Sequence, residues 1–150
     1  MSELLDRILS RDNMNLAYKR VKANKGAGGI DEVEVDELYS YIKENWKSIE
    51  EQIRQRTYKP QPVRRVEIPK PNGGKRKLGI PTVMDRVIQQ AIVQVISPMC
   101  EPCFSDRSYG FRPNRSCEMA IRKVLEYIND GCIWIVDIDL EKFFDNVPQD

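Results

Sequence analysis

Residues 132–145 read CIWIVDIDLEKFFD, and we predict that this stretch forms the strand around which the fold is organised. Its even positions from Cys132 to Leu140 are apolar, whereas its odd positions are apolar at first and then acidic at Asp137 and Asp139. A strand that is apolar on both faces is typical of the interior of a sheet. Because one face turns acidic where the strand ends, the pattern indicates a ligand site at that end.

Asp137 and Asp139 would lie about 6.6 Å apart on one face of such a strand. At an effective dielectric constant of about 20, two bare carboxylates at that distance repel by about 2.5 kcal/mol. A divalent cation reverses the sign, and Mg²⁺ is commonly held by one or two carboxylates together with water or phosphate oxygens. The alternative is a strand end that reaches solvent with two aspartates, and this segment by itself leaves both interpretations open.

Length and composition indicate one ordinary soluble domain. The chain has 150 residues, of which 41% are apolar and 31% are charged, and this is enough chain to bury a sizeable core. The apolar run from Cys132 to Val136 is far shorter than a membrane span. The N-terminus lacks the basic and then apolar layout of a signal peptide, so we expect a cytoplasmic protein with no membrane partner.

The net charge of +1 hides a strong segregation of charge along the chain. Residues 54–90 hold 10 basic and 2 acidic side chains, a net charge of +8, whereas residues 127–150 hold 1 and 6, a net charge of −5. A basic block is suited to a polyanion and an acidic block to a metal ion. We therefore predict that residues 54–90 bind nucleic acid.

Four cysteines offer two interpretations. Cys100 and Cys103 have the spacing of half a zinc site, and Cys117 and Cys132 would complete a four-cysteine cluster, although the chain has no histidine and no second close pair. Reduced cytosolic thiols that are partly buried are the interpretation we favour.

Before residue 60 the pattern is helical. Residues 2–9 have helical spacing, and Asp12 or Asn13 is the predicted cap of a second helix that runs to about Val21. Residues 25–29 are glycine-rich and predict a flexible loop. The clearest helix follows, with an apolar stripe from Val35 to Ile53 that needs only a core to pack on.

Residues 66–80 predict a β-hairpin around the turn-rich loop 71–75. We predict the register that pairs Val66 with Ile80 and Ile68 with Leu78, because a slip by one residue would expose the apolar set. The next pair toward the tip is then Lys70 with Arg76. Two cations on that face indicate an anion clamp, since arginine offers phosphate a forked donor. A solvated basic hairpin is the alternative.

After the hairpin we predict two helices and the loop between them. Thr82 caps a helix from Val83 to about Ser97 that Pro98 stops, and Asn114 or Ser116 caps another that runs to about residue 129. The loop 105–114 contains Arg107, Tyr109, Phe111 and Arg112. Arginines interleaved with aromatic rings often hold single-stranded nucleic acid, although Tyr109 and Phe111 are equally compatible with a core.

Three segments, taken together and in order, resemble one family. They are residues 68–81 (IPKPNGGKRKLGIP), 108–116 (SYGFRPNRS) and 137–145 (DIDLEKFFD). They are similar to the fingers and first palm motif of a group II intron reverse transcriptase, also called a maturase. The resemblance implies an α+β (α/β) fold, the right-hand polymerase fingers subdomain with a helical N-terminal extension (1–60), a fingers region with the β-hairpin (61–131) and the first palm strand (132–150).

The resemblance also implies roles for particular residues. Asp139 matches the first catalytic, metal-binding aspartate, assisted by the backbone carbonyl of Leu140, because it stands five residues before Phe144, which matches the residue that screens the sugar 2′-position. Asp137 is then a flanking acid. Lys70 and Arg76 match the fingers residues that hold the incoming triphosphate.

Residues 25–31 resemble the lid that closes over the template, and Glu32 stands where many relatives have glycine. We predict that seven basic residues contact RNA or template: Lys25, Arg64, Arg65, Lys75, Lys77, Arg112 and Arg115.

The implied activity is RNA-directed DNA synthesis by nucleotidyl transfer with two Mg²⁺ ions in the complete enzyme. The implied partners are group II intron RNA, whose splicing and mobility the protein assists, an RNA template with its DNA primer, and dNTPs. The family uses two further aspartates in a later motif, so we expect this chain to be a cut domain that is inactive alone and that can form a homodimer through exposed apolar surface. A non-catalytic RNA-binding module with a polymerase-like fold is the alternative.

Overall fold

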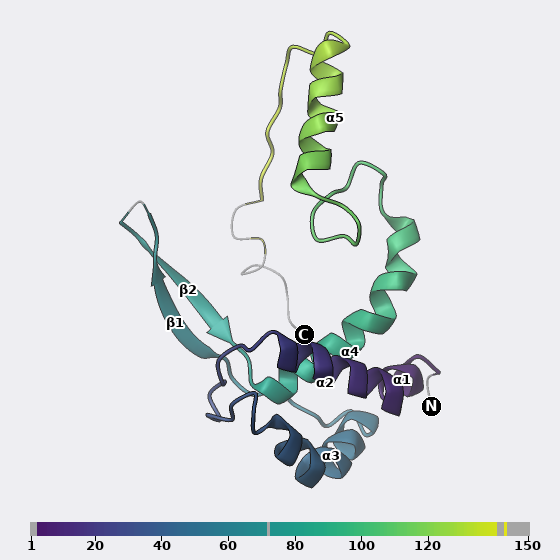
Figure 1. The fold of residues 1–150 in the computed structure, drawn as a ribbon, viewed down its shortest axis with the longest axis vertical. Coiled ribbons are helices and arrows are strands. Elements are labelled where there is room, and N and C mark those ends of the chain that lie inside the picture. Colours follow the sequence, from purple (N-terminus) through teal and green to yellow (C-terminus); the bar gives the residue numbers. More distant parts are fainter. Residues whose placement is uncertain (1–2, 72, 141–142, 144–150) are drawn as a thin grey trace. The chain divides into compact units, whose positions relative to one another are not determined.

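Helices and one hairpin make up the computed structural model, which describes residues 3–71, 73–140 and 143. The elements in order are α1 (Glu3–Ile8), α2 (Arg11–Ala23), α3 (Leu38–Arg54), β1 (Arg64–Pro69), β2 (Lys75–Ile80), α4 (Val83–Cys100), the 3₁₀ turn η1 (Glu101–Cys103) and α5 (Cys117–Asn129) (Figure 1). The chain divides into two compact units, Met1–Pro102 and Cys103–Asp150. This mixture of helices with a small antiparallel sheet confirms the α+β composition, whereas the three predicted subdomain boundaries stay a prediction.

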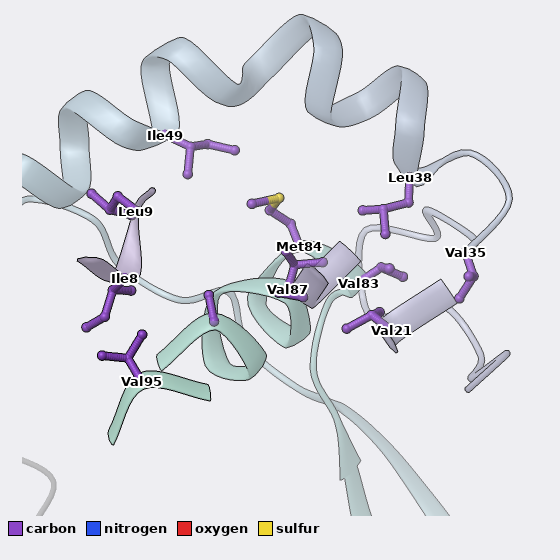
Figure 2. Packing of buried hydrophobic residues seen from close by; sticks show 12 residues of the cluster. Ile8, Leu9, Val21, Val35, Leu38, Ile49, Val83, Met84, Val87 and Val95 are labelled. Carbon is purple, nitrogen blue, oxygen red and sulfur yellow. The ribbon is translucent and has the colours of Figure 1, made fainter. Parts of the chain in front are cut away.

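The core of the first unit lies between its helices. In Figure 2 Leu38 and Ile49 point from α3 toward Met84 and Val87 of α4. α1 and α2 pack on α4 as well. The apolar stripe predicted from Val35 to Ile53 therefore faces a core, as expected.

Asn13 joins three helices of this unit. Its amide nitrogen donates to the carbonyl oxygens of Ile8 (2.8 Å) and Ala91 (3.0 Å), and its amide oxygen accepts from Gln94 (2.7 Å). The prediction that Asp12 or Asn13 caps α2 was wrong, because the Ser10 hydroxyl is the acceptor for a first-turn N–H group and Asn13 is turned inward.

The caps of the later helices were predicted correctly. Thr82 caps α4, and Ser116, one of the two predicted alternatives, caps α5. Pro98 does not stop α4, which continues to Cys100. Only two residues follow Pro98 in α4, so its missing N–H group and the clash of its ring with the carbonyl of residue i−4 disturb only the last turn.

The strand predicted from residue 132 is absent from the described part of the chain, where residues 132–140 have no regular structure. β1 and β2 pair only with each other among the described residues, so no neighbouring strand satisfies the backbone of this segment. Its apolar side chains are accordingly exposed, Trp134 by 88% and Val136 by 81%. The prediction of a buried interior strand was therefore wrong for residues 132–140.

Two smaller expectations concern the cysteines and the membrane. All four thiols are exposed rather than partly buried, because Cys132 lies in the irregular segment and the others lie on exposed positions of α4, η1 and α5. Within the described ranges no helix combines the length and the apolarity needed to cross a bilayer.

Candidate nucleic-acid interface

The hairpin forms in a register that differs by two residues from the predicted one. Val66 pairs with Leu78, Ile68 with Arg76 and Pro69 with Lys75. The turn decides this register, since the Lys70 N–H donates to the Gly74 carbonyl at 2.6 Å. Lys70 therefore begins the turn instead of facing Arg76 across the strands. Both side chains are exposed near the tip of the hairpin.

Cross-strand partners share a face, and the faces alternate along each strand. One face carries the apolar residues, together with Arg64 and Arg76. The other face carries Arg65, Lys75 and Lys77, and Glu67 binds Lys75 on it at 2.8 Å. The predicted apolar residues do lie on one face, because a shift of two residues in the register leaves each side chain on the same face of the sheet. It is not buried, however, since Val66 and Ile68 are both exposed.

Arg64 differs from the other predicted RNA-binding residues of the hairpin. It is half-buried at the base of β1, and its Nε atom is buried with no hydrogen-bond partner among the described residues. Arg65, Lys75 and Lys77 are exposed together on the opposite face. One face of the hairpin thus carries three exposed cations. The other face carries the apolar residues together with Arg64 and Arg76.

The glycine loop 25–31 packs closely on the start of α4. A Cβ atom at Gly29 would lie 2.5 Å from the Thr82 Cα, and one at Gly28 would lie 2.8 Å from the Val33 carbonyl oxygen. Arg86 donates from Nη2 to the Ala27 carbonyl at 2.6 Å. The loop that was predicted to be flexible is therefore fitted against α4.

Left-handed backbone bounds this loop on both sides. Lys25 has φ of +46° and Glu32 has φ of +59°, a region that favours glycine. This explains why glycine suits position 32. Lys25 lines a cleft of about 700 Å³ together with Lys19 and Lys22, and Glu34 and Asp36 line it as well. Sequence reasoning did not single out Lys19 and Lys22, which lie three residues apart on one face of α2.

A buried polar cluster joins α4 to the segments that flank the hairpin. Asp85 is 3% exposed, and its carboxylate accepts from the Tyr58 hydroxyl (2.6 Å), the Gln61 N–H (3.1 Å) and the Thr82 hydroxyl (2.7 Å). Burial, followed by the hydrogen bond to Asp85, raises the pKa of Tyr58 well above its ordinary value. Sequence reasoning missed this cluster, because its members are far apart in the chain.

In the second unit, two arginines hold the loop 104–115. Arg112 donates to the carbonyl oxygens of Ser105 (2.6 Å) and Ser108 (3.0 Å), and its guanidinium lies 5.2 Å from the centre of the Phe104 ring. Arg115 donates to the Asp106 carbonyl (3.1 Å) and lies 5.7 Å from the Tyr109 ring. These contacts give both arginines a role inside the loop, and their predicted contact with RNA stays a prediction.

Phe111 is the most exposed aromatic residue of this loop. Its side chain is fully in solvent, and its φ of +56° lies in the left-handed region. Both features are unfavourable for phenylalanine in an isolated protein. The core role considered for Phe111 is therefore wrong, whereas Tyr109 is half-buried under Arg115.

Asp139 lies in the irregular segment after α5. Its Oδ1 accepts from the Leu140 N–H at 2.9 Å, and the side chain is exposed, as is that of Asp137. Among the described residues no three His, Cys, Asp or Glu side chains gather as they would around a metal ion. Phe144 lies outside the described residues. Lys70 and Arg76 belong to the first unit and Asp139 to the second, and their predicted roles in holding a triphosphate and a metal ion stay predictions.

Comparison with known proteins gives consistent results. Residues 68–150 match the family described as reverse transcriptase (RNA-dependent DNA polymerase). The chain is 39% identical over 144 residues to the group II intron-encoded protein LtrA of Lactococcus lactis subsp. cremoris, which covers 93% of this chain and 23% of that protein. It is 38% identical over 132 residues to protein YkfC of Escherichia coli K12, covering 83% of this chain and 34% of that protein.

A third relative is the putative COX1/OXI3 intron 2 protein of Saccharomyces cerevisiae, 35% identical over 136 residues, or 89% of this chain and 15% of that protein. The chain thus spans about a quarter of the length of the first of these relatives.

Proposed function

We propose, because this chain belongs to the reverse transcriptase (RNA-dependent DNA polymerase) family, that the protein carrying these residues is the RNA-directed DNA polymerase of a group II intron. It would copy RNA into cDNA and bind intron RNA to assist splicing and mobility. The match over residues 68–150 carries this proposal, since it includes the tip of the hairpin with β2, the loop 104–115 and Asp139. We assign residues 1–60 to a helical N-terminal extension, residues 61–131 with the hairpin to the fingers, and residues 132–150 with Asp139 to the start of the palm.

Lys70 and Arg76 are proposed to hold the triphosphate of the incoming dNTP. Both are exposed near the hairpin tip, where a polyphosphate can approach without steric hindrance. Lysine contributes a compact charge and arginine a planar fork, a combination suited to several phosphate oxygens at once. The clamp does not require the cross-strand pairing that the sequence predicted.

Asp139 is proposed to be a ligand of Mg²⁺. An exposed carboxylate is the kind of donor that this ion takes from proteins, usually one or two at a site. Bound Mg²⁺ would neutralise the charge that develops on the oxygens during phosphoryl transfer. The Leu140 N–H, bonded to Oδ1 of Asp139 at 2.9 Å, orients the carboxylate. The backbone carbonyl of Leu140 is the second proposed donor.

RNA is proposed to contact three basic regions. The first is the hairpin face with Arg65, Lys75 and Lys77, the second is the glycine loop with Lys25, as a lid over the template, and the third is the loop 104–115. In that last loop Phe111 supplies an exposed ring for base stacking, and Arg112 and Arg115 supply nearby positive charge.

Primer extension in the full-length protein tests the polymerase assignment. With an RNA template, a DNA primer, dNTPs and Mg²⁺, the wild type should extend the primer and Asp139→Ala should not. Asp137→Ala is the matched control, because it removes a carboxylate two residues away and should keep much of the activity. If neither the wild type nor the control extends a primer while both bind intron RNA, the non-catalytic module is the better assignment.

Two further measurements test the binding roles. Replacing Lys70 and Arg76 together with Ala should raise the Michaelis constant for dNTP, and an unchanged constant would remove them from the nucleotide site. RNA affinity of the chain should fall by about 10-fold or more between roughly 50 and 300 mM salt, because each phosphate contact releases counterions.

A further inference from the structure

The carboxylate of Asp85 accepts three hydrogen bonds. Its Oδ1 accepts from the Tyr58 hydroxyl, and its Oδ2 accepts from the Gln61 N–H and the Thr82 hydroxyl. The Asp85 N–H in turn donates to the Thr82 hydroxyl oxygen at 3.1 Å. A charged group that is 3% exposed is tolerated only when hydrogen bonds replace water. Asp85 is therefore held in one place by three separate points of the chain.

These points lie at the two ends of the hairpin. Gln61 comes just before β1 begins at Arg64, and Thr82 comes just after β2 ends at Ile80. One carboxylate on the first turn of α4 thus fastens both the entry to the hairpin and the exit from it. Tyr58 adds a third attachment on the entry side.

The hairpin depends on this attachment, because little else holds it. Its strands pair only with each other among the described residues, and most of its side chains are exposed. A two-stranded hairpin is only marginally stable by itself in water. Six residues of strand extend about 20 Å, so a small tilt at the base moves the tip by several ångströms.

We propose that Asp85 is a positioning residue, which fixes the hairpin on α4 and thereby sets where Lys70 and Arg76 are presented to the incoming nucleotide. The nucleotide part of this inference rests on the proposed function. Asp85 lies at the base of the hairpin and Lys70 and Arg76 near its tip, so Asp85 acts through the hairpin and not by touching the nucleotide.

The neighbouring residue provides a matched control. Arg86 lies on the same turn of α4, but its guanidinium donates to the Ala27 carbonyl and so holds the glycine loop. Arg86→Met would release that loop and leave the hairpin attachment intact. A general weakening of α4 would affect both attachments, whereas loss of either side chain affects only its own.

Amide hydrogen exchange on the chain tests the mechanical part without any need for catalysis. Asp85→Asn keeps the volume and an acceptor for Tyr58, but its amide nitrogen cannot accept from the Gln61 N–H. Relative to the amides of α2, exchange of the β1 and β2 amides should become at least about 10-fold faster. The loss of one or two hydrogen bonds lowers the free energy needed to open the hairpin locally. Arg86→Met should leave this ratio unchanged and raise exchange in the glycine loop.

Steady-state kinetics on the full-length protein test the nucleotide part. Asp85→Asn should raise the Michaelis constant for dNTP by about 5-fold or more, with a smaller change in kcat. Loss of folded enzyme lowers kcat alone, so it does not imitate this result. Gln89→Ala, at an exposed position of α4, should leave the dNTP constant within about twofold of the wild type.

The outcomes are separable from those of the polymerase assignment. If the wild type extends primers but Asp85→Asn changes neither hairpin exchange nor the dNTP constant, the positioning role is overturned and the polymerase assignment stands. If the wild type extends nothing, the polymerase assignment fails, while faster hairpin exchange in Asp85→Asn still supports the attachment. Equal exchange in the hairpin of both forms, relative to α2, overturns the attachment in either case.

Discussion

The hydroxyl of Tyr58 donates a 2.6 Å hydrogen bond to Oδ1 of Asp85, which lies 27 residues later in the chain. Tyr58 follows α3 and Asp85 lies on α4, so this bond joins the end of the N-terminal helices to the helix that follows the hairpin. We expect Tyr58→Phe to lower the free energy of unfolding by about 1.5–3 kcal/mol, the range for a hydrogen bond to a charged group. Urea denaturation measures it, and a loss below about 0.5 kcal/mol would contradict the structure.

Ionisation of the Tyr58 hydroxyl should make the free energy of unfolding depend on pH. Because its pKa is raised in the folded state above the ordinary 10.0, its contribution is fully present below pH 10 and is lost as the pH rises above that value. For one group the free energy of unfolding falls by at most about 1.4 kcal/mol per pH unit. Solvent screening of the half-buried ring reduces the total loss. Urea denaturation of the wild type and of Tyr58→Phe between about pH 9 and 11 isolates the contribution of Tyr58, since the free energies of unfolding of the two proteins should converge with rising pH. A constant difference between them would rule out this pH dependence.

We expect Asn13 to contribute more to the free energy of unfolding of the first unit than its place in the sequence suggests. Asn13→Ala removes the bonds to the Ile8 and Ala91 carbonyls and to Gln94, and leaves those groups without this partner. We expect a loss of about 2–4 kcal/mol, the sum of lost hydrogen bonds and unpaired polar groups. Asn15→Ala is the control, because Asn15 is exposed on the same helix. Equal losses in the two variants would argue against the bridging role.

The helices, their caps at Thr82 and Ser116, and the existence of the hairpin follow from local patterns, so the sequence predicts them well. The hairpin register depends instead on the turn, where Lys70 bonds to Gly74, and alternation cannot distinguish registers that differ by two residues. The segment 132–140 has the composition of a buried strand, but burial depends on a neighbouring strand that no local pattern reveals. The composition of residues 132–140 therefore predicts a tendency to form a strand. Whether the strand forms depends on a second strand with which it can pair.

The candidate site shows the same division. Lys70, Arg76, Asp139 and the loop 104–115 were singled out because sequence motifs contain them, and their roles stay predictions. Asp85 was counted only as one of two acids in a basic block. Its partners Tyr58 and Gln61 lie 27 and 24 residues away, and no periodic pattern relates them.

Backbone conformation around the glycine loop gives a pair of opposite predictions. Glu32→Gly should raise the free energy of unfolding by up to about 1 kcal/mol, since φ of +59° is costly for an L-residue and not for glycine. Gly29→Ala should lower it by more than 1 kcal/mol, because the new Cβ would lie 2.5 Å from the Thr82 Cα. Thermal or urea unfolding measures both, and a destabilising Glu32→Gly would mean that Glu32 contributes through its side chain.

Phe111 allows stability and binding to be separated. Its ring is fully exposed at a φ of +56°, so Phe111→Gly removes no packing and relieves a strained backbone, and stability should not fall. If the ring stacks on a base, the same change should weaken single-stranded RNA binding by about 5- to 100-fold, the equivalent of roughly 1–3 kcal/mol. Fluorescence anisotropy at fixed salt measures the affinity, and Phe111→Trp is the control that keeps a stacking surface. Unchanged affinity in Phe111→Gly would exclude stacking, whereas loss in Phe111→Gly with retention in Phe111→Trp would establish that the loop exposes this ring for a ligand.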